Sequence, residues 1–352
     1  MKEFTVNLKT LTPLWTGDAW LNNNSIRPSA LIGSLRFWFE TICFFSGIED
    51  ESDYQDEIKK GKGKFDYEIF QKTLLYNGLS FNTLNELFNS MEIPIPSRIF
   101  GMTNFKSTIS IKKIEFDKNN FSNKPKGKII NDKNKNWYWK DPSYQGEFSV
   151  TFEVQNDIVE PIFYPLLNFM DQYGFWGGGW NIGYGRLKID GINGSKEWRK
   201  DTFEFSKFNK SYSNKNISDI VIYENIKNEG EQNENLLKQF LGFDFSSLNN
   251  IRDKDMIMRI PKKIIVIKTN PNKEGHTNEV FETIKELIQK KAKMRSILRN
   301  LNKDFKELRH SLFGKSGEEG SKILPWINNE YVGGLMSIGG LIKLKKEERN
   351  NG

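Results

Sequence analysis

The chain is poor in the two residue types that build most disulfides and zinc sites. Its 352 residues include one cysteine, Cys43, and two histidines, His276 and His310. One thiol cannot form a disulfide within the chain, and one thiol with two imidazoles does not complete a tetrahedral zinc site. We therefore expect no disulfide framework, no metal and no other cofactor.

Long apolar runs are also missing. No stretch approaches the roughly 20 apolar residues that a membrane-spanning helix needs. The first residues, Met1 to Phe4, contain no basic segment followed by an apolar run, so they do not resemble a signal peptide. We expect a cytoplasmic protein without a membrane partner.

Aromatic and basic residues are plentiful. Aromatic residues make up 13% of the chain, which is enough for a sizeable core, and the length predicts two domains. Lys and Arg number 52 and Asp and Glu 45, for a formal net charge of +7. An excess of positive charge favours an anionic partner, with nucleic acid as the first candidate.

The first 195 residues show alternating hydrophobic patterns separated by helical ones. Strands are predicted at about 4–8, 108–116, 148–154 and 187–192, and helices from residue 28 and over 160–175. This order, strand–helix–strand–strand–helix–strand, is that of a ferredoxin-like fold. We expect a domain over 1–195, with a helical insertion at about 65–90 and a basic hairpin insertion at about 106–146.

The remainder predicts a second, less complete domain. Residues 196–216 are polar and are interpreted as a linker to a domain over 217–352, which begins with a helical stretch over 217–258. It contains a long amphipathic helix at about 277–312. Leu312-Phe313-Gly314 repeats Ile99-Phe100-Gly101, each between a helix and a strand. The fold prediction is α+β with tandem ferredoxin-like domains, the second incomplete or diverged because it has no second glycine-rich loop.

The strongest local motif runs from Trp176 to Arg186. It is not a phosphate-binding P-loop and not a dinucleotide fingerprint, because no Gly-Lys-Ser/Thr follows and the motif precedes a strand. Glycines allow close approach of a ligand, and exposed N–H groups bind phosphates. The candidate RNA contacts here are Gly178, Gly179, Trp180, Asn181, Gly183, Tyr184 and Arg186. A tight turn packed by its glycines is an equally good interpretation.

A second candidate is the helix that begins after Arg27. A helix N-terminus attracts phosphates, Arg27 and Ser29 lie at that end, and Arg36 lies two turns further along. An ordinary capped helix is the competing interpretation, favoured when this motif is taken alone. Arg98, just before Ile99-Phe100-Gly101, is added as a further candidate RNA contact.

Two lysine-rich stretches complete the candidates. In the insertion, Trp137 and Trp139 stand among lysines, a combination that suits single-stranded nucleic acid. A solvated hairpin is the usual alternative. The basic stretch from Lys290 to Arg299 is interpreted mainly as a solvated helix face.

Little in the sequence indicates catalysis. Cys43 lies among apolar residues and is interpreted as a core thiol. His310 and Ser311 are neighbours on a predicted helix, where consecutive side chains do not face each other. Asp18 could hold a metal or orient a reacting hydroxyl, but an Asp in such a turn more often caps the turn. We therefore expect a protein that is not an enzyme and has no catalytic residues.

Three of these segments resemble the RAMP family, the repeat-associated proteins of type III CRISPR effector complexes. They are Leu11-Thr-Pro-Leu-Trp-Thr-Gly-Asp18, Arg27-Pro-Ser-Ala-Leu-Ile-Gly-Ser-Leu-Arg-Phe-Trp38 and Gly177-Gly-Gly-Trp-Asn-Ile-Gly-Tyr-Gly-Arg186, with Phe100-Gly101 in addition. Within the family, the chain most resembles the first subunit of the type III-B (Cmr) complex. The resemblance covers about residues 1–192 and is weaker beyond.

The resemblance implies a non-catalytic RNA-binding subunit that caps the complex near the 3′ part of the guide RNA. Its partners would be the CRISPR guide RNA, the complementary target RNA and other RAMP subunits. Target cutting in that family belongs to another subunit, through an Asp in a loop comparable to that of Asp18. The chain departs from the family at Ile32, where a basic residue is common.

Two other functions remain open from the sequence. A metal-independent RAMP endoribonuclease that processes guide precursors would need a His, Tyr or Lys as general acid or base. Both histidines lie in the half that matches the family poorly. A protein-only assembly module would not need an accessible glycine-rich loop.

Overall fold

The computed structural model describes most of the chain. The described residues are 1–17, 22–49, 65–78, 80–122, 128–130, 136–138, 142–193, 195, 197–208, 211–225, 233–243, 253–269, 277–301, 305–315 and 319–342. Asp18, His276, Trp139 and the side chain of Trp137 lie outside them, as does most of the basic insertion. The chain forms two compact units, the first being 1–124, 141–178 and 184–220, and the second 125–140, 179–183 and 221–352.

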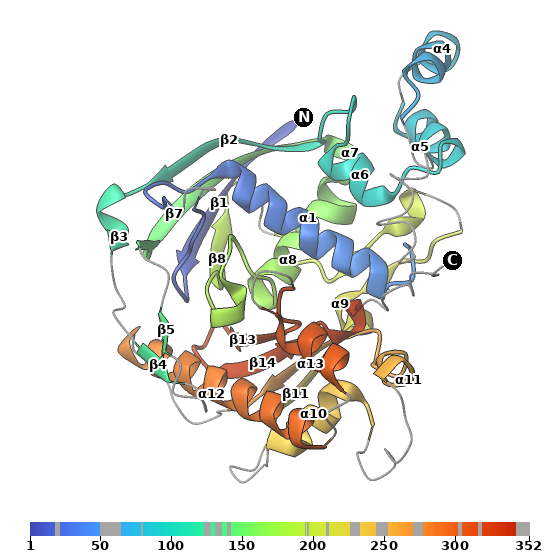
Figure 1. Ribbon diagram of the computed structural model, residues 1–352. Helices are drawn as coiled ribbons and strands as arrows, with labels where there is room; N and C mark the ends of the chain where they lie inside the picture. Colours follow the sequence, from blue (N-terminus) through green and yellow to red (C-terminus); the bar gives the residue numbers. More distant parts are fainter. Residues whose placement is uncertain are drawn as a thin grey trace. The chain divides into compact units, whose positions relative to one another are not determined.

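The first unit is built on a four-stranded antiparallel sheet (Figure 1). Its strands are β1 (Lys2–Thr10), β2 (Ile109–Phe116), β7 (Glu147–Val154) and β8 (Leu187–Ile192), in the spatial order β2-β7-β1-β8. The main helices are α1 (Pro28–Phe45), α6 (Ile95–Phe100) and α8 (Tyr164–Gln172). With insertions left out, the order is the predicted strand–helix–strand–strand–helix–strand.

Smaller elements decorate this unit. They are α4 (Tyr67–Asn77), α5 (Phe81–Ser90), η1 (Lys118–Asn120), β3 (Phe121–Ser122), β6 (Ser143–Tyr144), α7 (Asn156–Ile158), the π-helical turn η2 (Val159–Phe163), β9 (Thr202–Phe203), η4 (Phe205–Lys207), β10 (Lys215–Asn216) and α9 (Ile217–Ile220). The predicted linker 196–216 is wrong as a linker. Phe203, Phe205 and Phe208 are buried in the first unit, because burying large aromatic side chains is favourable even when their neighbours in the sequence are polar.

Hydrophobic periodicity explains the core of the first unit. Phe4, Val6 and Leu8 of β1 are buried on one face of the sheet, as alternation predicts. The predicted apolar stripe of α1 is also buried: Leu31, Leu35, Trp38, Phe39 and Ile42. Helices α1 and α8 pack on each other, and each also contacts a strand of the sheet.

The second unit has its own sheet, in the order β11-β12-β14-β13. Its elements are β4 (Lys128–Ile130), β5 (Asn136–Tyr138), η3 (Trp180–Ile182), β11 (Val221–Asn225), α10 (Asn233–Leu241), α11 (Asp253–Ile257), β12 (Ile264–Lys268), α12 (Thr277–Leu301), α13 (Lys306–Phe313), β13 (Ile323–Ile327), β14 (Gly333–Ser337) and η6 (Gly339–Leu341). Strand β11 runs parallel to β12, and the other pairs are antiparallel.

Two predictions for this unit need correction. The single helix expected over 277–312 is two helices, because α12 ends at Leu301 and α13 begins at Lys306. The helical stretch expected over 217–258 contains strand β11, whose pairing with β12 outweighs local helical preference. The broad α+β class holds. Within the described residues, no helix is both long and apolar enough to span a bilayer.

The two Phe-Gly motifs form nearly the same corner. Gly101 has φ 85° and ψ 163°, and Gly314 has φ 82° and ψ 156°. A serine further along the chain, Ser107 or Ser321, closes each corner with a hydroxyl that lies within hydrogen-bond distance of two carbonyls. Ser107 Oγ lies 3.1 Å from Ile99 O and 2.5 Å from Ile109 O, and Ser321 Oγ lies 3.2 Å from Leu312 O and 2.7 Å from Ile323 O. Each hydroxyl also accepts from the N–H two residues later, at 3.2 Å in both corners.

Candidate nucleic-acid interface

The glycine-rich loop begins against helix α1. The backbone N–H of Gly177 donates to the hydroxyl of Ser34 at 2.8 Å. The indole N–H of Trp38 donates to the carbonyl of Phe175 at 3.0 Å. Ser34 and Trp38 are four residues apart and share one face of the helix. The middle and last sequence motifs are therefore in direct contact within the first unit.

The segment that follows β1 runs along the same loop. The N–H of Gly178 donates to the Trp15 carbonyl at 2.8 Å, and that of Gly185 to the Pro13 carbonyl at 2.9 Å. The Arg186 N–H donates to the Thr12 hydroxyl at 2.9 Å. All three sequence motifs thus meet. The sequence did not indicate Thr12, Ser34 or Trp38 as connecting residues, because their bonds join positions distant along the chain.

Two glycines of the loop are required by its packing. Gly177 and Gly185 have φ of 67° and 88°, which side chains rarely adopt. A Cβ at Gly177 would overlap the carbonyl oxygen of Trp15, and one at Gly185 the carbonyl oxygen of Trp176. At these two positions the structure favours the packed-turn interpretation.

The middle of the loop belongs to the second unit. Gly179 and Gly183, with φ of 82° and 81°, flank the short turn η3. The Lys291 ammonium of α12 donates to the Asn181 carbonyl at 3.0 Å. Asn181 is exposed and Trp180 half-buried, so both side chains remain accessible to a ligand.

Arg186 is not accessible to a ligand. Its side chain is fully buried and donates to the carbonyls of Met170, Asp171, Gln172 and Gly174, at the C-terminal end of α8. Those carbonyls have no partners within the helix, and a cation at that end also complements the helix dipole. Burial lowers the pKa of Arg186 to about 9. Arg186 is a structural cap, and its burial contradicts the expected RNA contact.

Tyr184 and Arg98 are buried as well. The Tyr184 side chain has no exposed surface, and Arg98 is 7% exposed. The Arg98 guanidinium donates to the Ile93 carbonyl at 2.7 Å and lies 5.8 Å from the ring centre of Phe88. Burial lowers the pKa of Arg98 to about 10. As with Arg186, apolar surroundings hold these side chains inside, against the prediction that they contact RNA.

The N-terminal end of α1 keeps its predicted exposure. Pro28 and Ser29 are exposed, Arg27 is half-buried, and the first turn holds no acidic residue. Arg36, further along, forms an ion pair with Glu40 at 2.8 Å and donates to the Gly101 carbonyl at 3.1 Å. Any RNA contact of Arg36 therefore competes with these two bonds.

The open face of the first sheet is unlike an RNA-binding stacking platform. Across its four strands, the side chains on this face are polar and paired with one another rather than aromatic. The pairs are Thr5 with Thr151, Lys9 with Glu147, Lys112 with Glu3, Ser110 with Glu153 and Lys188 with Asp190. RNA-recognition sheets stack bases on aromatic residues, so this face is not a candidate interface.

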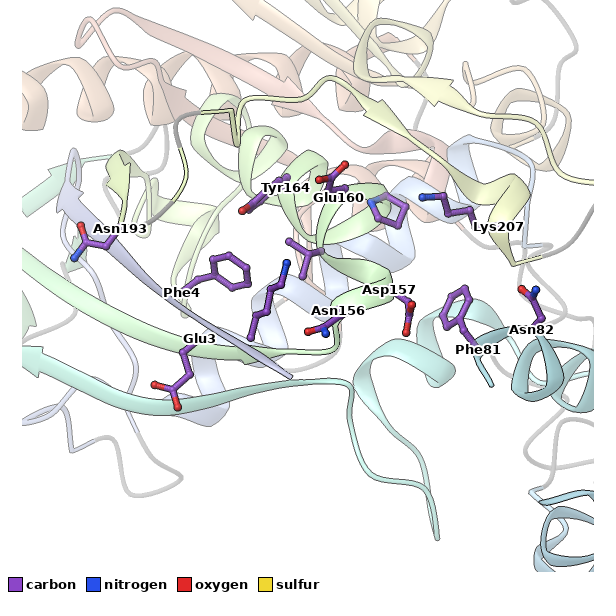
Figure 2. A pocket seen from close by; sticks show the side chains of 13 residues that line it. Glu3, Phe4, Phe81, Asn82, Asn156, Asp157, Glu160, Tyr164, Asn193 and Lys207 are labelled. Carbon is purple, nitrogen blue, oxygen red and sulfur yellow. The ribbon is translucent and has the colours of Figure 1, made fainter. Parts of the chain in front are cut away.

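A cleft of about 730 Å³ lies elsewhere in the first unit (Figure 2). Figure 2 shows Phe81 and Asn82 of α5 on one side and Asn193 on the other. Its charged lining residues are Lys2, Lys207, Glu3, Asp157 and Glu160. Three carboxylates against two ammonium groups do not suit a phosphate backbone.

The metal-ligating side chains and the thiol can be located among the described residues. No set of three His, Cys, Asp or Glu side chains within them is placed to hold a metal. Cys43 is fully buried, and burial, with Glu49 and Glu40 nearby, raises the pKa of its thiol. This confirms Cys43 as a core thiol, since the thiolate is the nucleophilic form.

The comparison with protein families agrees with the motifs. The sequence pattern of the RAMP superfamily matches residues 7–188. No curated protein sequence matches. Among solved structures, the crystal structure of apo Cmr1 from Pyrococcus furiosus is similar, with 13% identity, 96% of this chain and 86% of that chain covered, and a TM-score of 0.37. A cryo-EM structure of the type III-B Cmr-beta complex, bound to cognate target RNA and AMPPnP in the presence of ssDNA, also matches. It has 13% identity, covers 95% of this chain and 93% of that one, and has a TM-score of 0.37. The family match spans more than half of the chain and contains all three motifs, so the chain belongs to the RAMP superfamily.

Proposed function

We propose that this chain is a non-catalytic RNA-binding subunit of a type III-B CRISPR effector complex. It caps the complex near the 3′ part of the guide RNA, contacts guide and target RNA, and has other RAMP subunits as neighbours. Membership in the RAMP superfamily and the resemblance of its motifs to the first Cmr subunit support this proposal.

We further propose that both units are ferredoxin-like and that the second is incomplete. In the first unit, β1, β2 and β7 occupy adjacent places in the sheet; in the second, β12, β13 and β14 do so in the same relative order. The matched Phe-Gly corners support the correspondence. The fourth place is filled differently, by β8 in the first sheet and by β11 in the second.

One observation carries the RNA-binding proposal: the convergence of the three family motifs. The bonds from Gly177 to Ser34 and from Gly178 to Trp15 hold the glycine-rich loop beside α1. Arg27 and Ser29 lie at the end of that helix, where the positive dipole and free N–H groups favour phosphate.

Salt titration of RNA binding tests this backbone-led mode. A labelled single-stranded guide-type RNA is titrated with the full chain at several salt concentrations. With roughly four phosphates contacted, log K falls against log salt with a slope of about −3, about −0.7 for each phosphate. Affinity that does not depend on salt, or a strong preference for one sequence, contradicts the proposal.

Substitutions at α1 and in the loop test the location. Arg27→Ala combined with Ser29→Ala weakens RNA binding, and Gly179→Val does so by straining a loop residue whose φ is 82°. Lys113→Ala, on the open sheet face, is the matched control and leaves affinity unchanged. Circular dichroism establishes that each variant folds. Folded loop and helix variants with wild-type affinity and normal incorporation into a reconstituted complex contradict the assignment.

The ribonuclease alternative depends on one observation, the position of His310. It lies on α13, and burial and the neighbouring Arg309, Arg295, Lys315 and Lys306 lower its pKa. A neutral imidazole among cations is a possible general base for RNA cleavage. We propose that the chain does not cut RNA. Labelled guide precursor incubated with the chain stays intact, and products that disappear in His310→Asn would establish the alternative.

The proposed absence of catalysis also covers target cutting. Asp18→Ala in a reconstituted complex leaves every target cleavage product in place. Loss of one product on this change alone would contradict the non-catalytic assignment.

A further inference from the structure

The second unit carries a group of cations on α12 and α13. Lys291, Arg295 and Arg299 are spaced four residues apart and form one stripe along α12. Helix α13 contributes Arg309 and His310. The two helices pack through a shared core that includes Met294, Leu298, Leu308 and Leu312, which brings the cationic residues of the two helices together. We call Lys291, Arg295, Arg309 and His310 the basic cluster.

The cations of this cluster repel one another. Burial lowers the pKa of Arg295, and Arg309 lowers it further. Burial also lowers the pKa of His310. The neighbouring cations Arg309, Arg295, Lys315 and Lys306 lower it further. Within the described residues, neither Arg295 nor Arg309 forms an ion pair. The nearest acidic residue in the sequence, Glu307 on α13, is exposed.

Such an arrangement opposes folding unless something compensates for it. Half-buried guanidinium groups lose hydration, and like charges nearby add repulsion. Lys291 is 4% exposed, with a single hydrogen bond among the described residues, to a neutral carbonyl. A bound polyanion supplies the missing negative charge and releases its own counterions when it binds.

The bond from Lys291 to Asn181 joins the cluster to the glycine-rich loop. The loop segment Gly179–Gly183 and both helices belong to the second unit. This bond places the backbone of Asn181 against α12, where the Asn181 side chain is exposed and the neighbouring Trp180 is half-buried. An aromatic ring next to cations is the pairing that binds single-stranded nucleic acid, since bases stack while phosphates meet positive charge. An acidic protein surface would use the cations but would not require the ring.

We propose that Arg295, Arg309 and His310, joined to Trp180 and Asn181 through the buried Lys291, form a binding surface for the phosphate backbone of single-stranded RNA. It is a second surface, distinct in its residues from the N-terminal end of α1. The proposal rests on the proposed function, because it names where in the second unit the chain would hold RNA.

The test compares full-length variants in RNA binding. Labelled oligouridylate is titrated with wild-type chain and with the double variant Arg295→Gln, Arg309→Gln. The matched control is Lys285→Gln, an exposed position on the same helix that is paired with Glu282. We expect the double variant to bind about tenfold more weakly near 0.1 M salt and its salt slope to be smaller by about 1.4, or about 0.7 for each lost phosphate contact. The control keeps the wild-type affinity and slope.

Trp180→Ala weakens binding without changing the slope, because stacking releases no counterions.

A thermal melt separates this surface from a structural role. Removing mutually repelling charges leaves the melting temperature unchanged or raises it. If the double variant melts as wild type does and binds RNA with wild-type affinity and slope, the inference is wrong while RNA binding by the chain stands. A lowered melting temperature with unchanged RNA affinity also overturns it and makes the cluster structural. If the wild-type chain binds no RNA even at low salt, the proposed function fails and this surface fails with it.

Discussion

The two units of this chain share the geometry of their Phe-Gly corner but differ in the strand that forms one edge of the sheet. In both, a helix ends at Phe-Gly, the glycine takes a conformation with φ near 85°, and a serine closes the turn before the next strand. In the first sheet, the strand beside β1 is β8, which is antiparallel and comes last. In the second, the strand beside β12 is β11, which is parallel and comes first.

This difference shows which parts of a fold depend on specific residues. The corner needs glycine, because a Cβ at Gly101 would lie 2.8 Å from Ser107 N and one at Gly314 would lie 2.9 Å from Glu319 O. The edge position needs only a strand with unpaired backbone groups and apolar side chains of matching register. It can therefore be filled from either end of the sequence.

The largest expected effect concerns the cap on α8 in the first unit. Arg186→Met removes the cap on α8 and leaves four buried carbonyls without a donor. We expect a loss of about 3–5 kcal/mol in the free energy of unfolding, because each buried carbonyl left without a donor costs about 1–3 kcal/mol. Urea denaturation measures it.

Arg199→Met is the control for that prediction. Arg199 lies 3.8 Å from the carboxylate of Asp171, next to the cap, but its side chain is 60% exposed. We expect a change below about 1 kcal/mol. Equal effects of the two substitutions would show that Arg186 does not stabilise α8 in the way we describe.

The next prediction tests whether the two Phe-Gly corners depend equally on their glycine. Gly101→Ala and Gly314→Ala each combine backbone strain with a close contact to backbone atoms. We expect each to destabilise by about 3 kcal/mol, because strain at such φ and ψ costs about 1–3 kcal/mol before the contact is added. Gly320→Ala, with open space around its Cβ, is the control. Unequal costs at the two corners would weaken the correspondence between the units.

A smaller effect tests the same corners at their hydrogen bonds. Ser107→Ala and Ser321→Ala each remove a hydroxyl that donates to one carbonyl and accepts one N–H. We expect losses of about 1–2 kcal/mol in each case, measured by urea denaturation. If only one of the two substitutions lowered the free energy of unfolding, the two corners would share their geometry but not their contribution to stability.

The last prediction concerns Lys291, a buried cation of the second unit. Burial, with Arg295 nearby, lowers the pKa of Lys291 to about 7, against about 10.4 in an unfolded chain. The folded state therefore binds this proton less readily than the unfolded state. The penalty is full below pH 7 and disappears as the pH rises towards 10.

Lys291→Met removes that penalty. Relative to wild type, the variant gains more stability at pH 7 than at pH 9.5. Unfolding in urea at the two pH values measures this difference. A difference between variant and wild type that does not change with pH would show that Lys291 is not desolvated in the folded chain.

The sequence was sufficient wherever the determining interactions are local. Alternation placed β1 and β7, the stripe of α1 identified its buried face, and the repeated Phe-Gly identified two equivalent corners. It was insufficient for candidate RNA contacts. Arg186 and Arg98 are basic and lie in family-like motifs, yet both are buried. Only the path of α8 and of the residues before α6 shows which carbonyls their guanidinium groups bind.

Sequence alone therefore determined the family motifs, the α+β class and the cationic composition, since each depends on residue type and spacing along the chain. The tertiary structure decided that Gly179–Gly183 groups with the second unit, that Lys291 is buried against Asn181, and that β11 fills the fourth place in its sheet. These depend on contacts between residues more than 40 positions apart, where the burial of apolar surface and the pairing of backbone groups outweigh any local preference.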